Sequence, residues 1–467
     1  MCSCALSQGK NVILIENDKM GGTCLNKGCI PTKALCKSAE VVEIVKNAHK
    51  YGITLENVVP DFASAVERKD SIVSQMRKNV EIMLSKATVI NGEAVFVDAS
   101  TVQVGEEQFS APVIVVATGS KPAMLPIEGA ELCVDSTFVL DSKVLPERIC
   151  IVGGGVIGME LACILNAYGV DVTVVEFCSE ILPNFDKEVA KRLRSMLNRK
   201  GVKILVSAAV TSVKQGFVVN YTTKGKEMSL DTDMVLMAVG RKPVIPKGLE
   251  EVGVKTSRKG IEVDTNYATN IPGIYAIGDC NGEMMLAHVA EAQARVINGE
   301  AVNMNVVPAD VFTDPECAMV GLTQEQCVEK QLPIKISKSL FRSNGKANAM
   351  DNTDGFVKII VNSETQQILG CHIIGPHASD LIQEIANAMA DGKLTATVIV
   401  TSGQNKLSGR PSIKAGTARV DDEVEVVKYT WKEYGATGDV AALKAEWDKI
   451  ENVDVSKMAA GEEVTVI

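Results

Sequence analysis

The sequence lacks the features that would point to a membrane or to a nucleic acid. Its 467 residues contain no apolar run of about 18 residues, the length from which a membrane-spanning helix is predicted. Acidic residues outnumber basic ones, and the formal net charge of −10 disfavours binding to a phosphate backbone. No charged-then-apolar signal segment stands at the N-terminus. We therefore expect no membrane and no nucleic acid among the partners of this protein.

A disulfide framework is also missing, because the 13 cysteines follow no regular spacing. Free thiols are typical of reducing compartments, so this cysteine usage predicts a cytoplasmic protein. No metal site is expected. The length, with 46% hydrophobic residues, allows several cores and suggests about three domains.

Two of the cysteines stand in an unusual context. Cys24 and Cys29 lie five residues apart in GGTCLNKGCIPTKAL, residues 21–35. The glycines before the pair and Pro31 after it fit a tight loop that leads into a helix. A helix start favours thiolate, which makes a cysteine there a better nucleophile and leaving group. The stretch therefore predicts an exchangeable redox disulfide, with two buried structural cysteines as the alternative.

The stretch from Arg148 to Glu176 has the order of a complete dinucleotide-binding unit. An apolar strand runs into a glycine turn, a helical pattern follows, and a second strand ends in Glu176. The glycines in the required G-x-G-x-x-G spacing are Gly153, Gly155 and Gly158. Glu176 would accept both ribose hydroxyls and repel a 2′-phosphate, and the next arginine is as far away as Arg192. The sequence therefore predicts NAD rather than NADP.

A second unit of this kind, at the start of the chain, is incomplete. The run NVILIE, residues 11–16, reads as the second strand of such a unit and ends in Glu16. A glycine turn should lie roughly 20 residues before that acid, but Met1 comes too soon. We expect the first strand and the glycine turn to be absent, so that a dinucleotide held here loses the main anchor of its phosphates.

These motifs resemble those of the flavoprotein disulfide reductases, and within that family the dihydrolipoamide dehydrogenases, from about Ser7 to about Ala396. The resemblance implies an α/β fold with two Rossmann-like dinucleotide-binding domains, for FAD and for NAD, followed by an α+β dimer-interface domain. The FAD-binding domain would comprise residues 1–145 and 265–305. The NAD-binding domain would comprise residues 146–264, the dimerisation domain residues 306–396, and a tail of unrecognised origin residues 397–467.

The resemblance also implies roles for single residues. A dithiol would attack the disulfide at Cys24, and Cys29 would pass electrons to the flavin. Lys33 would lie near the reactive nitrogen of the flavin and pair with Glu160, the alternative being two unrelated surface charges. Further implied contacts to FAD are Glu16, Ala94, Gly119, Ser120, Asp279, Ala287 and His288, and the implied contact to the nicotinamide nucleotide is Gly240. The stretch around Ala94 is equally typical of an ordinary hairpin, and His288 fits a structural role better than proton transfer.

The resemblance fails after about Ala396, where the family carries a His-Pro pair whose histidine exchanges protons with the substrate dithiol. The four histidines of this sequence are His49, His288, His372 and His377, and none follows Ala396. Proton transfer of this kind is typically worth about 10²- to 10⁴-fold in rate, so we expect severe loss of turnover. His377 is a poor substitute because its motif matches a structural position.

The leading hypothesis is a homodimeric enzyme that oxidises dihydrolipoamide, or the lipoyl domain of a 2-oxoacid dehydrogenase or glycine cleavage complex, with NAD⁺. One alternative is a catalytically silent NAD-binding or scaffold protein. Another is a shortened reading frame joined to foreign sequence after Ala396. In the tail, VDDEVEVVKY alternates like a strand. A helix is expected after a cap at Thr437, and one face of it would be formed by Val440, Leu443, Trp447 and Ile450.

Overall fold

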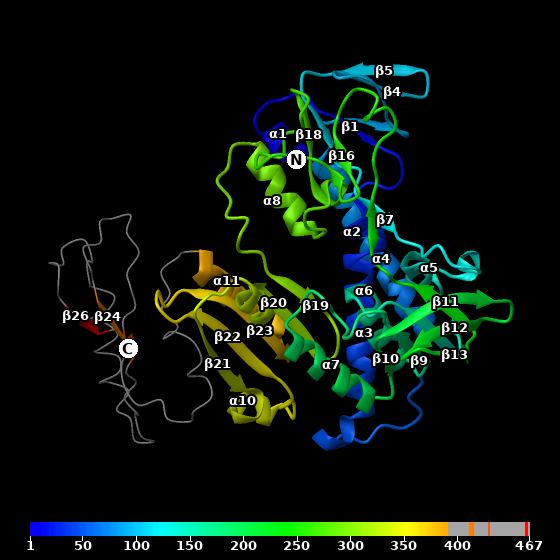
Figure 1. Cartoon of the computed structure of the whole chain (residues 1–467), viewed down its shortest axis with the longest axis vertical. Helices are drawn as coiled ribbons and strands as arrows, with labels where there is room; N and C mark the ends of the chain where they lie inside the picture. Colours follow the sequence, from blue (N-terminus) through cyan, green and yellow to red (C-terminus); the bar gives the residue numbers. More distant parts are fainter. Residues whose placement is uncertain (391–410, 415–427, 430–462, 466–467) are drawn as a thin grey trace. The chain divides into compact units, whose positions relative to one another are not determined.

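The computed structural model describes residues 1–390, 411–414, 428–429 and 463–465. The chain divides into two compact units, of which the first comprises Met1–Lys338 and Asp354–Val398 and the second Ser339–Thr353 and Ile399–Ile467. The mixed α/β architecture expected from the sequence is confirmed in the first unit (Figure 1). Among the described helices, none combines the length and the apolar character needed to cross a bilayer.

The complete nucleotide unit folds as a four-stranded parallel sheet. Its strand order is β10-β9-β8-β14, with bounds Lys203–Leu205, Asp171–Val175, Arg148–Val152 and Met234–Met237. Every residue of β8 after Arg148 is buried, as expected for a central parallel strand covered on both faces. The helices are α6 (Val156–Ala167) and α7 (Lys187–Arg199), and an antiparallel sheet adds β11 (Ala208–Lys214), β12 (Val218–Thr223) and β13 (Lys226–Asp231).

The unit at the start of the chain has only fragments of such a sheet. Strand β1 (Ile13–Glu16) pairs in parallel with β2 (Thr88–Asn91), and β6 (Ile114–Val116) pairs in parallel with β18 (Ile274–Ala276). In the complete unit β9 lies between β10 and β8, whereas among the described strands β1 has one neighbour only. No residue of β1 is fully buried, and Ile13 is 45% exposed. Among the described strands, this sheet thus contains no counterpart of β8 beside β1.

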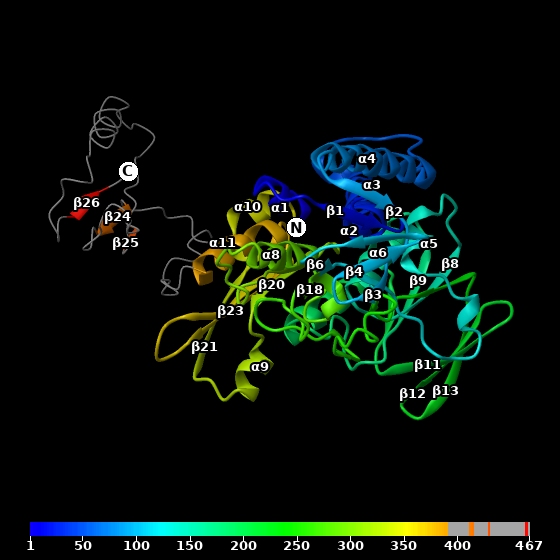
Figure 2. The same ribbon diagram turned by 90° about the horizontal axis from the view of Figure 1, so that it is seen from above.

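Small antiparallel sheets and helices surround these strands. The sheets join β3 (Val95–Asp98), β4 (Thr101–Val104) and β5 (Glu107–Ser110); β7 (Ser120–Pro122) and β15 (Arg241–Pro243); and β16 (Thr256–Ser257) and β17 (Gly260–Ile261). The helices are α1 (Cys2–Ser7), α2 (Gly22–Lys27), α3 (Cys29–Lys46), α4 (Phe62–Met83), α5 (Ser136–Asp141) and α8 (Ala287–Ile297), with 3₁₀ turns η1 (Ala48–Tyr51), η2 (Ala130–Leu132) and η3 (Gly278–Asn281). Helix α3 packs against both α4 and α6 (Figure 2).

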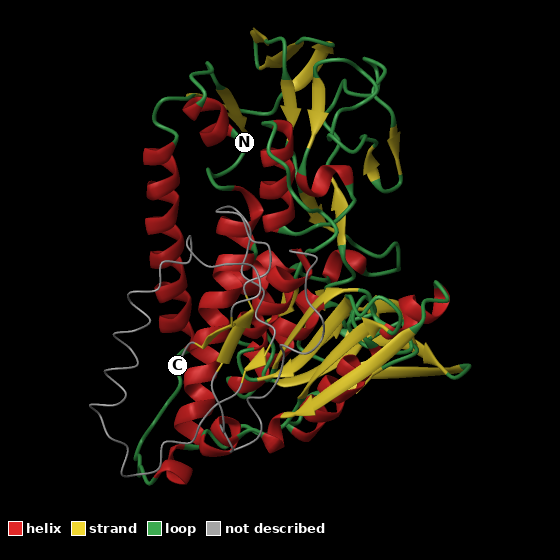
Figure 3. Ribbon diagram, turned by 90° about the vertical axis from the view of Figure 1, so that its left-hand side faces the viewer, coloured by secondary structure: helices red, strands yellow, loops and turns green. Residues whose placement is uncertain are grey.

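The last part of the first unit is a five-stranded sheet in the order β19-β20-β23-β22-β21 (Figure 3). The strand bounds are Ala309–Val311, Glu316–Gly321, Ile368–Gly375, Phe356–Asn362 and Ile334–Leu340. Helix α11 (Ala378–Ala390) packs against β20 and β23 through its buried face, and α9 (Gln324–Glu329) follows β20 with a capping box at Thr323. This sheet therefore has the α+β character that the resemblance implies.

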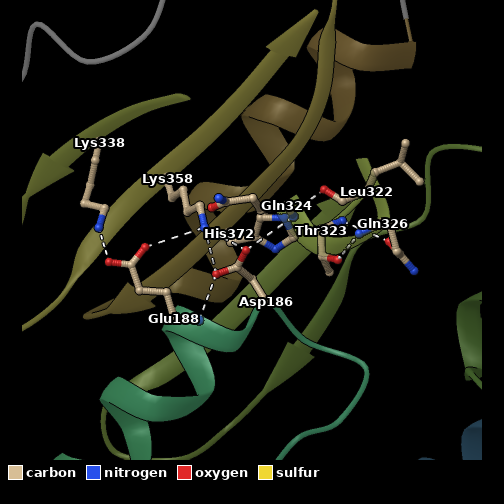
Figure 4. A network of polar contacts seen from close by, with 9 residues as sticks. All are labelled: Asp186, Glu188, Leu322, Thr323, Gln324, Gln326, Lys338, Lys358 and His372. Atoms are coloured by element: carbon tan, nitrogen blue, oxygen red, sulfur yellow. Dashed lines mark hydrogen bonds and ion pairs between the residues drawn. The ribbon is translucent and has the colours of Figure 1, made fainter. Parts of the chain in front are cut away.

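A buried ion pair joins the nucleotide unit to this sheet (Figure 4). Lys358 on β22 places its Nζ 2.8 and 3.0 Å from the two carboxylate oxygens of Asp186, the residue that caps the start of α7. Both side chains are almost inaccessible, with exposed fractions of 2% and 0%. His372, on the adjacent strand β23, donates a 2.9 Å hydrogen bond from its Nε2 to the carbonyl oxygen of Leu322. Charged groups so far from water persist only when they are paired, so the cluster fixes the position of α7 on the sheet.

The described part of the second unit contains η4 (Phe341–Ser343), α10 (Gly345–Ala349) and a three-stranded antiparallel sheet. Its strand order is β25-β24-β26, with bounds Lys428–Tyr429, Pro411–Lys414 and Glu463–Thr465. The strand expected in VDDEVEVVKY is described only at its last two residues. The helical face expected after Thr437 lies outside the described residues.

Candidate active site

The two cysteines of the predicted redox pair lie together at the junction of α2 and α3. Cys24 is in α2, and Cys29 is the first residue of α3, after a break at Gly28. Both are half-buried free thiols. The two thiols interact directly: the contact with Cys24 and the charge of Lys33 lower the pKa of Cys29, while the contact with Cys29 and burial raise the pKa of Cys24. Cys29 is therefore the thiolate of the pair and the better leaving group.

Lys33 lies one helical turn after Cys29, and its Nζ is 3.0 Å from Oε1 of Glu160 on α6. Its positive charge also helps to lower the pKa of Cys29, whereas the Glu160 carboxylate raises it. Glu160 accepts a second hydrogen bond from the backbone N–H of Phe312, whose ring centroid is 4.3 Å from Lys33 Nζ. The structure thus brings together the two charges that the resemblance pairs, and it adds Phe312, which the sequence did not single out.

A polar cluster links the segment after β6 to η3. The Ser120 hydroxyl lies 2.5 Å from Oδ2 of Asp279, and Arg241 donates to the Ser120 hydroxyl and carbonyl, both at 2.7 Å. Burial lowers the pKa of Arg241, while Asp279 and Cys29 act in the opposite direction. Sequence reasoning named Ser120 and Asp279 but missed Arg241, although it directly follows Gly240 in AVGRKP.

Helix α8 begins at Ala287, and His288 is its second residue. The His288 ring makes a 3.0 Å hydrogen bond between Nε2 and the carbonyl oxygen of Pro308, so this nitrogen is occupied by the backbone. Gln293, on the same helix, accepts from the backbone N–H of Gly278, but its own buried amide nitrogen has no partner among the described residues.

The glycines of the complete unit have two different functions. At Gly153 and Gly158 a Cβ would lie 2.4 Å from the carbonyl oxygen of Ala238 and 2.1 Å from that of Gly153, so only glycine fits the fold there. At Gly155 a Cβ would meet nothing within 4 Å, so the backbone faces open space. Glu176 accepts hydrogen bonds from the backbone N–H groups of Gly154 and Cys178, which hold its carboxylate beside the turn. This geometry suits a nucleotide that approaches the backbone closely.

Two positions named for the adenosine part of FAD, Glu16 and Ala94, have different surroundings in the structure. Glu16 accepts from the backbone N–H of Asp18 and lines a cavity of about 510 Å³ that also involves Lys19, Arg77 and Asn91. Ala94 instead packs against the apolar cluster around Phe96.

Gly119 and Gly240, like Gly155, face open space. Among the described residues, no three His, Cys, Asp or Glu side chains gather as a set of metal ligands.

Comparison with known proteins agrees with this geometry. The chain matches the family model "Pyridine nucleotide-disulphide oxidoreductase" over residues 2–294 and the dimerisation domain of the same family over residues 307–403. It is 35% identical to a dihydrolipoyl dehydrogenase of Geobacillus stearothermophilus, over 91% of this chain and 94% of that protein. It is 38% identical to a dihydrolipoyl dehydrogenase of Chlamydia pneumoniae, over 80% and 84% of the two chains.

Among solved structures, the fold is similar to the HOCl-induced flavoprotein disulfide reductase RclA from Escherichia coli. The TM-score is 0.75 at 28% sequence identity, over 86% of this chain and 94% of that one. The match to a dimerisation domain supports a homodimer. The thiol pair, the nucleotide turn and these likenesses lead to one conclusion: the chain belongs to the pyridine nucleotide-disulphide oxidoreductase family, as a flavin-dependent disulfide oxidoreductase whose cofactors are FAD and NAD(H).

Proposed function

We propose that this chain oxidises dihydrolipoamide, free or on a lipoyl domain, with NAD⁺ as the final acceptor. The observation that carries the proposal is the hydrogen-bonded pair of Cys24 and Cys29, in which one thiol is stabilised as an acid and the other as a thiolate. The substrate class comes from the dihydrolipoyl dehydrogenases that the chain resembles.

The proposed thiol chemistry starts from the disulfide form of the pair. A substrate thiolate attacks Sγ of Cys24, the Cys24–Cys29 bond breaks, and Cys29 leaves as a thiolate that Lys33 stabilises. The second substrate thiol then displaces Cys24 from the mixed disulfide, which releases the oxidised cyclic product and leaves two reduced cysteines. Bound FAD would take the electron pair from the thiols and pass it to NAD⁺ as hydride.

The residues present fit the flavin half of FAD and the whole of NAD. Ser120 and Asp279 offer polar groups, and the helix dipole at the start of α8 favours negative charge. Gly155 and Gly240 leave open space beside the backbone for the nicotinamide nucleotide, with Glu176 for its ribose. Among the described residues, the sheet around β1 contains no glycine turn like that after β8, so the groups that would hold the phosphates of FAD are not identified there.

We infer that turnover of this chain is slow, since no described histidine is suited to exchange a proton with the dithiol. His49 is exposed in η1, His288 is bound to the carbonyl of Pro308, and His372 is buried. His377 lies 3.6 Å from Asp380 at the start of α11. Missing general acid–base catalysis typically costs about 10²- to 10⁴-fold in rate. These positions support the sequence-based expectation of weak activity.

A second candidate function is NAD binding without catalysis. It is favoured by the contrast between a complete glycine turn in one unit and two separate strand pairs in the other. The two functions differ in whether the protein can hold FAD.

The deciding experiment is a titration of the purified full chain with FAD, followed by visible absorbance after removal of free flavin. Retained flavin colour that responds to dihydrolipoamide, with slow NAD⁺ reduction that is lost in Cys29→Ser, would support the enzyme. A colourless protein that still binds NADH would favour the silent binder. Co-purification of a lipoyl domain with the wild-type chain, tested beside the Cys24→Ser variant, would address the partner. The mass of the protein in solution tests the homodimer.

A further inference from the structure

One carboxylic acid near the thiol site has no evident structural purpose. Asp310 lies in the middle of β19, where it pairs in register with Ala318 of β20. Its Oδ1 is buried and has no hydrogen-bond partner among the described residues. Aspartate is depleted in strands, and an unpartnered buried carboxyl group costs free energy. A residue that opposes local stability in this way is typical of a functional position.

Strand β19 runs directly past the ion pair of Lys33 and Glu160. At one end, the carbonyl of Pro308 meets the ring of His288 at the start of α8. At the other end, Phe312 donates its N–H to Glu160 and places its ring 4.3 Å from Lys33 Nζ. Side chains two residues apart in an extended segment share a face, so the carboxyl group of Asp310 points to the same side as the Phe312 ring. Asp310 thus lies on the side of β19 that faces Lys33.

The surroundings of Asp310 contain one cation and three other carboxyl groups. Burial raises the pKa of Asp310 to about 6, helped by Glu316 on β20, Asp380 on α11 and Glu160 on α6, and opposed by Lys33 on α3. The three other carboxyl groups all have partners. Glu316 accepts from the N–H and hydroxyl of Ser379, Asp380 lies beside His377, and Glu160 binds Lys33 and Phe312. Among these carboxyl groups only Asp310 is left unpaired in the described part of the chain.

We propose that Asp310 is a positioning residue of the thiol site: its carboxyl group sets the net charge around Lys33 and thereby controls how much of Cys29 exists as thiolate. The inference deepens the proposed function and rests on it, because Lys33 is one of the groups that stabilise the Cys29 thiolate. An ionised Asp310 offsets the positive charge of Lys33 and disfavours the thiolate. A protonated Asp310 leaves that charge to Cys29.

The test is the rate at which iodoacetamide alkylates Cys29 in the reduced, cofactor-free full chain as a function of pH, with the modified residue identified by mass spectrometry. The variants are Asp310→Asn and Asp310→Val, which remove the charge, and Asp310→Glu, which keeps it. Asp98→Asn is the matched control, because Asp98 is the exposed last residue of β3 and its carboxylate accepts hydrogen bonds from Ser100 in the following turn. Thermal unfolding of each variant confirms that it is folded.

At about pH 6.5 we expect roughly threefold faster alkylation of Cys29 in the Asn and Val variants than in wild type, since a modest fall in the pKa of the thiol raises its thiolate fraction by that factor. The difference should vanish at about pH 5, where Asp310 of the wild type is itself protonated. The Glu and Asp98→Asn variants should follow wild type. Merely altered packing would change the rate by the same factor at every pH.

Unchanged Cys29 profiles in folded Asn and Val variants would overturn the proposal, and so would a difference that does not depend on pH. If both neutral variants fail to fold, the wild-type profile decides. In wild type, the rate of Cys29 alkylation then supports the proposal if it rises over a wider pH range than the titration of a single group would give. A curve that fits the titration of a single group contradicts it. If Cys29 reacts no faster than the buried thiols, the result counts against the proposed thiol chemistry itself. Failure of the proposed function can thus be told apart from failure of the role proposed for Asp310.

Discussion

Lys33 and Glu160 are 127 residues apart in the sequence, yet their Nζ and Oε1 atoms lie 3.0 Å apart in the fold. The pair connects α3, which begins at the redox cysteine Cys29, to α6, which begins at the nucleotide turn. Glu160 is almost completely buried, while Lys33 is about one-third exposed. One charged contact therefore joins the helix that carries Cys29 to the helix that follows the nucleotide turn. We expect a substitution of either Lys33 or Glu160 to change the charge around Cys29.

Replacing Lys33 by methionine should make Cys29 a weaker thiolate. The variant loses the positive charge that lowers the pKa of Cys29, and it leaves the Glu160 carboxylate, which raises that pKa, without its cation. We expect alkylation of Cys29 at about pH 6.5 to be roughly five- to tenfold slower than in wild type. Lys37→Met is the matched control, since Lys37 lies one turn further along α3 and pairs only with exposed Glu40. An equal effect in both variants would contradict the specific role of Lys33.

Replacing Lys358 by methionine should strongly destabilise the fold. The variant removes the partner of Asp186 and leaves a carboxylate with no exposed surface beside the start of α7. Breaking one partner of a buried ion pair typically costs about 3–5 kcal/mol. The free energy of unfolding from denaturant titration measures the loss. Lys203→Met, which breaks an exposed pair with Asp171, should cost less than about 1 kcal/mol. The double variant Lys358→Met, Asp186→Asn removes the unpaired charge and keeps an oxygen that can cap α7, so it should recover part of the lost stability.

His372 should make the protein less stable in mild acid. Burial lowers its pKa, so the unfolded chain binds a proton before the folded one. The contribution of neutral His372 to stability is therefore complete above the unfolded pKa of about 6.5 and is lost as the pH falls from there through the folded pKa. His372→Gln keeps a donor for the Leu322 carbonyl but cannot titrate. It should reduce the slope of unfolding free energy against pH by up to about 1.4 kcal/mol per pH unit. An unchanged slope in a folded His372→Gln variant would contradict this prediction.

The parts of the site that the sequence predicts are those that depend on local spacing. Gly153, Gly155 and Gly158 form a turn within six residues, and Cys24 and Cys29 lie at a single helix junction. The pairing of Lys33 with Glu160 was accessible only through the family resemblance, because no local pattern relates two residues so distant in sequence.

What sequence reasoning missed depends on long-range packing. Arg241 reaches Ser120 across 121 residues, and Lys358 reaches Asp186 across 172. Asp310 looks like an ordinary polar residue in VVPADVF until the fold brings the charges of Lys33 and Glu316 into its surroundings. A long polar side chain can be buried or exposed in the same sequence context, so its partner becomes visible only when the elements are assembled.

The contrast between Gly155 and Gly158 allows nucleotide binding to be separated from folding. In Gly155→Ala the new methyl group enters open space at an ordinary backbone conformation, so the unfolding transition should stay where it is. The same methyl group occupies the surface where NADH would approach the backbone, and the affinity for NADH should fall at least about tenfold, equivalent to roughly 1.4 kcal/mol. Fluorescence titration with NADH and a thermal unfolding curve measure the two effects on one sample. In Gly158→Ala the methyl group would lie 2.1 Å from the carbonyl oxygen of Gly153, so both stability and binding should be lost. Unchanged NADH affinity in a folded Gly155→Ala variant would mean that the nucleotide does not use this turn.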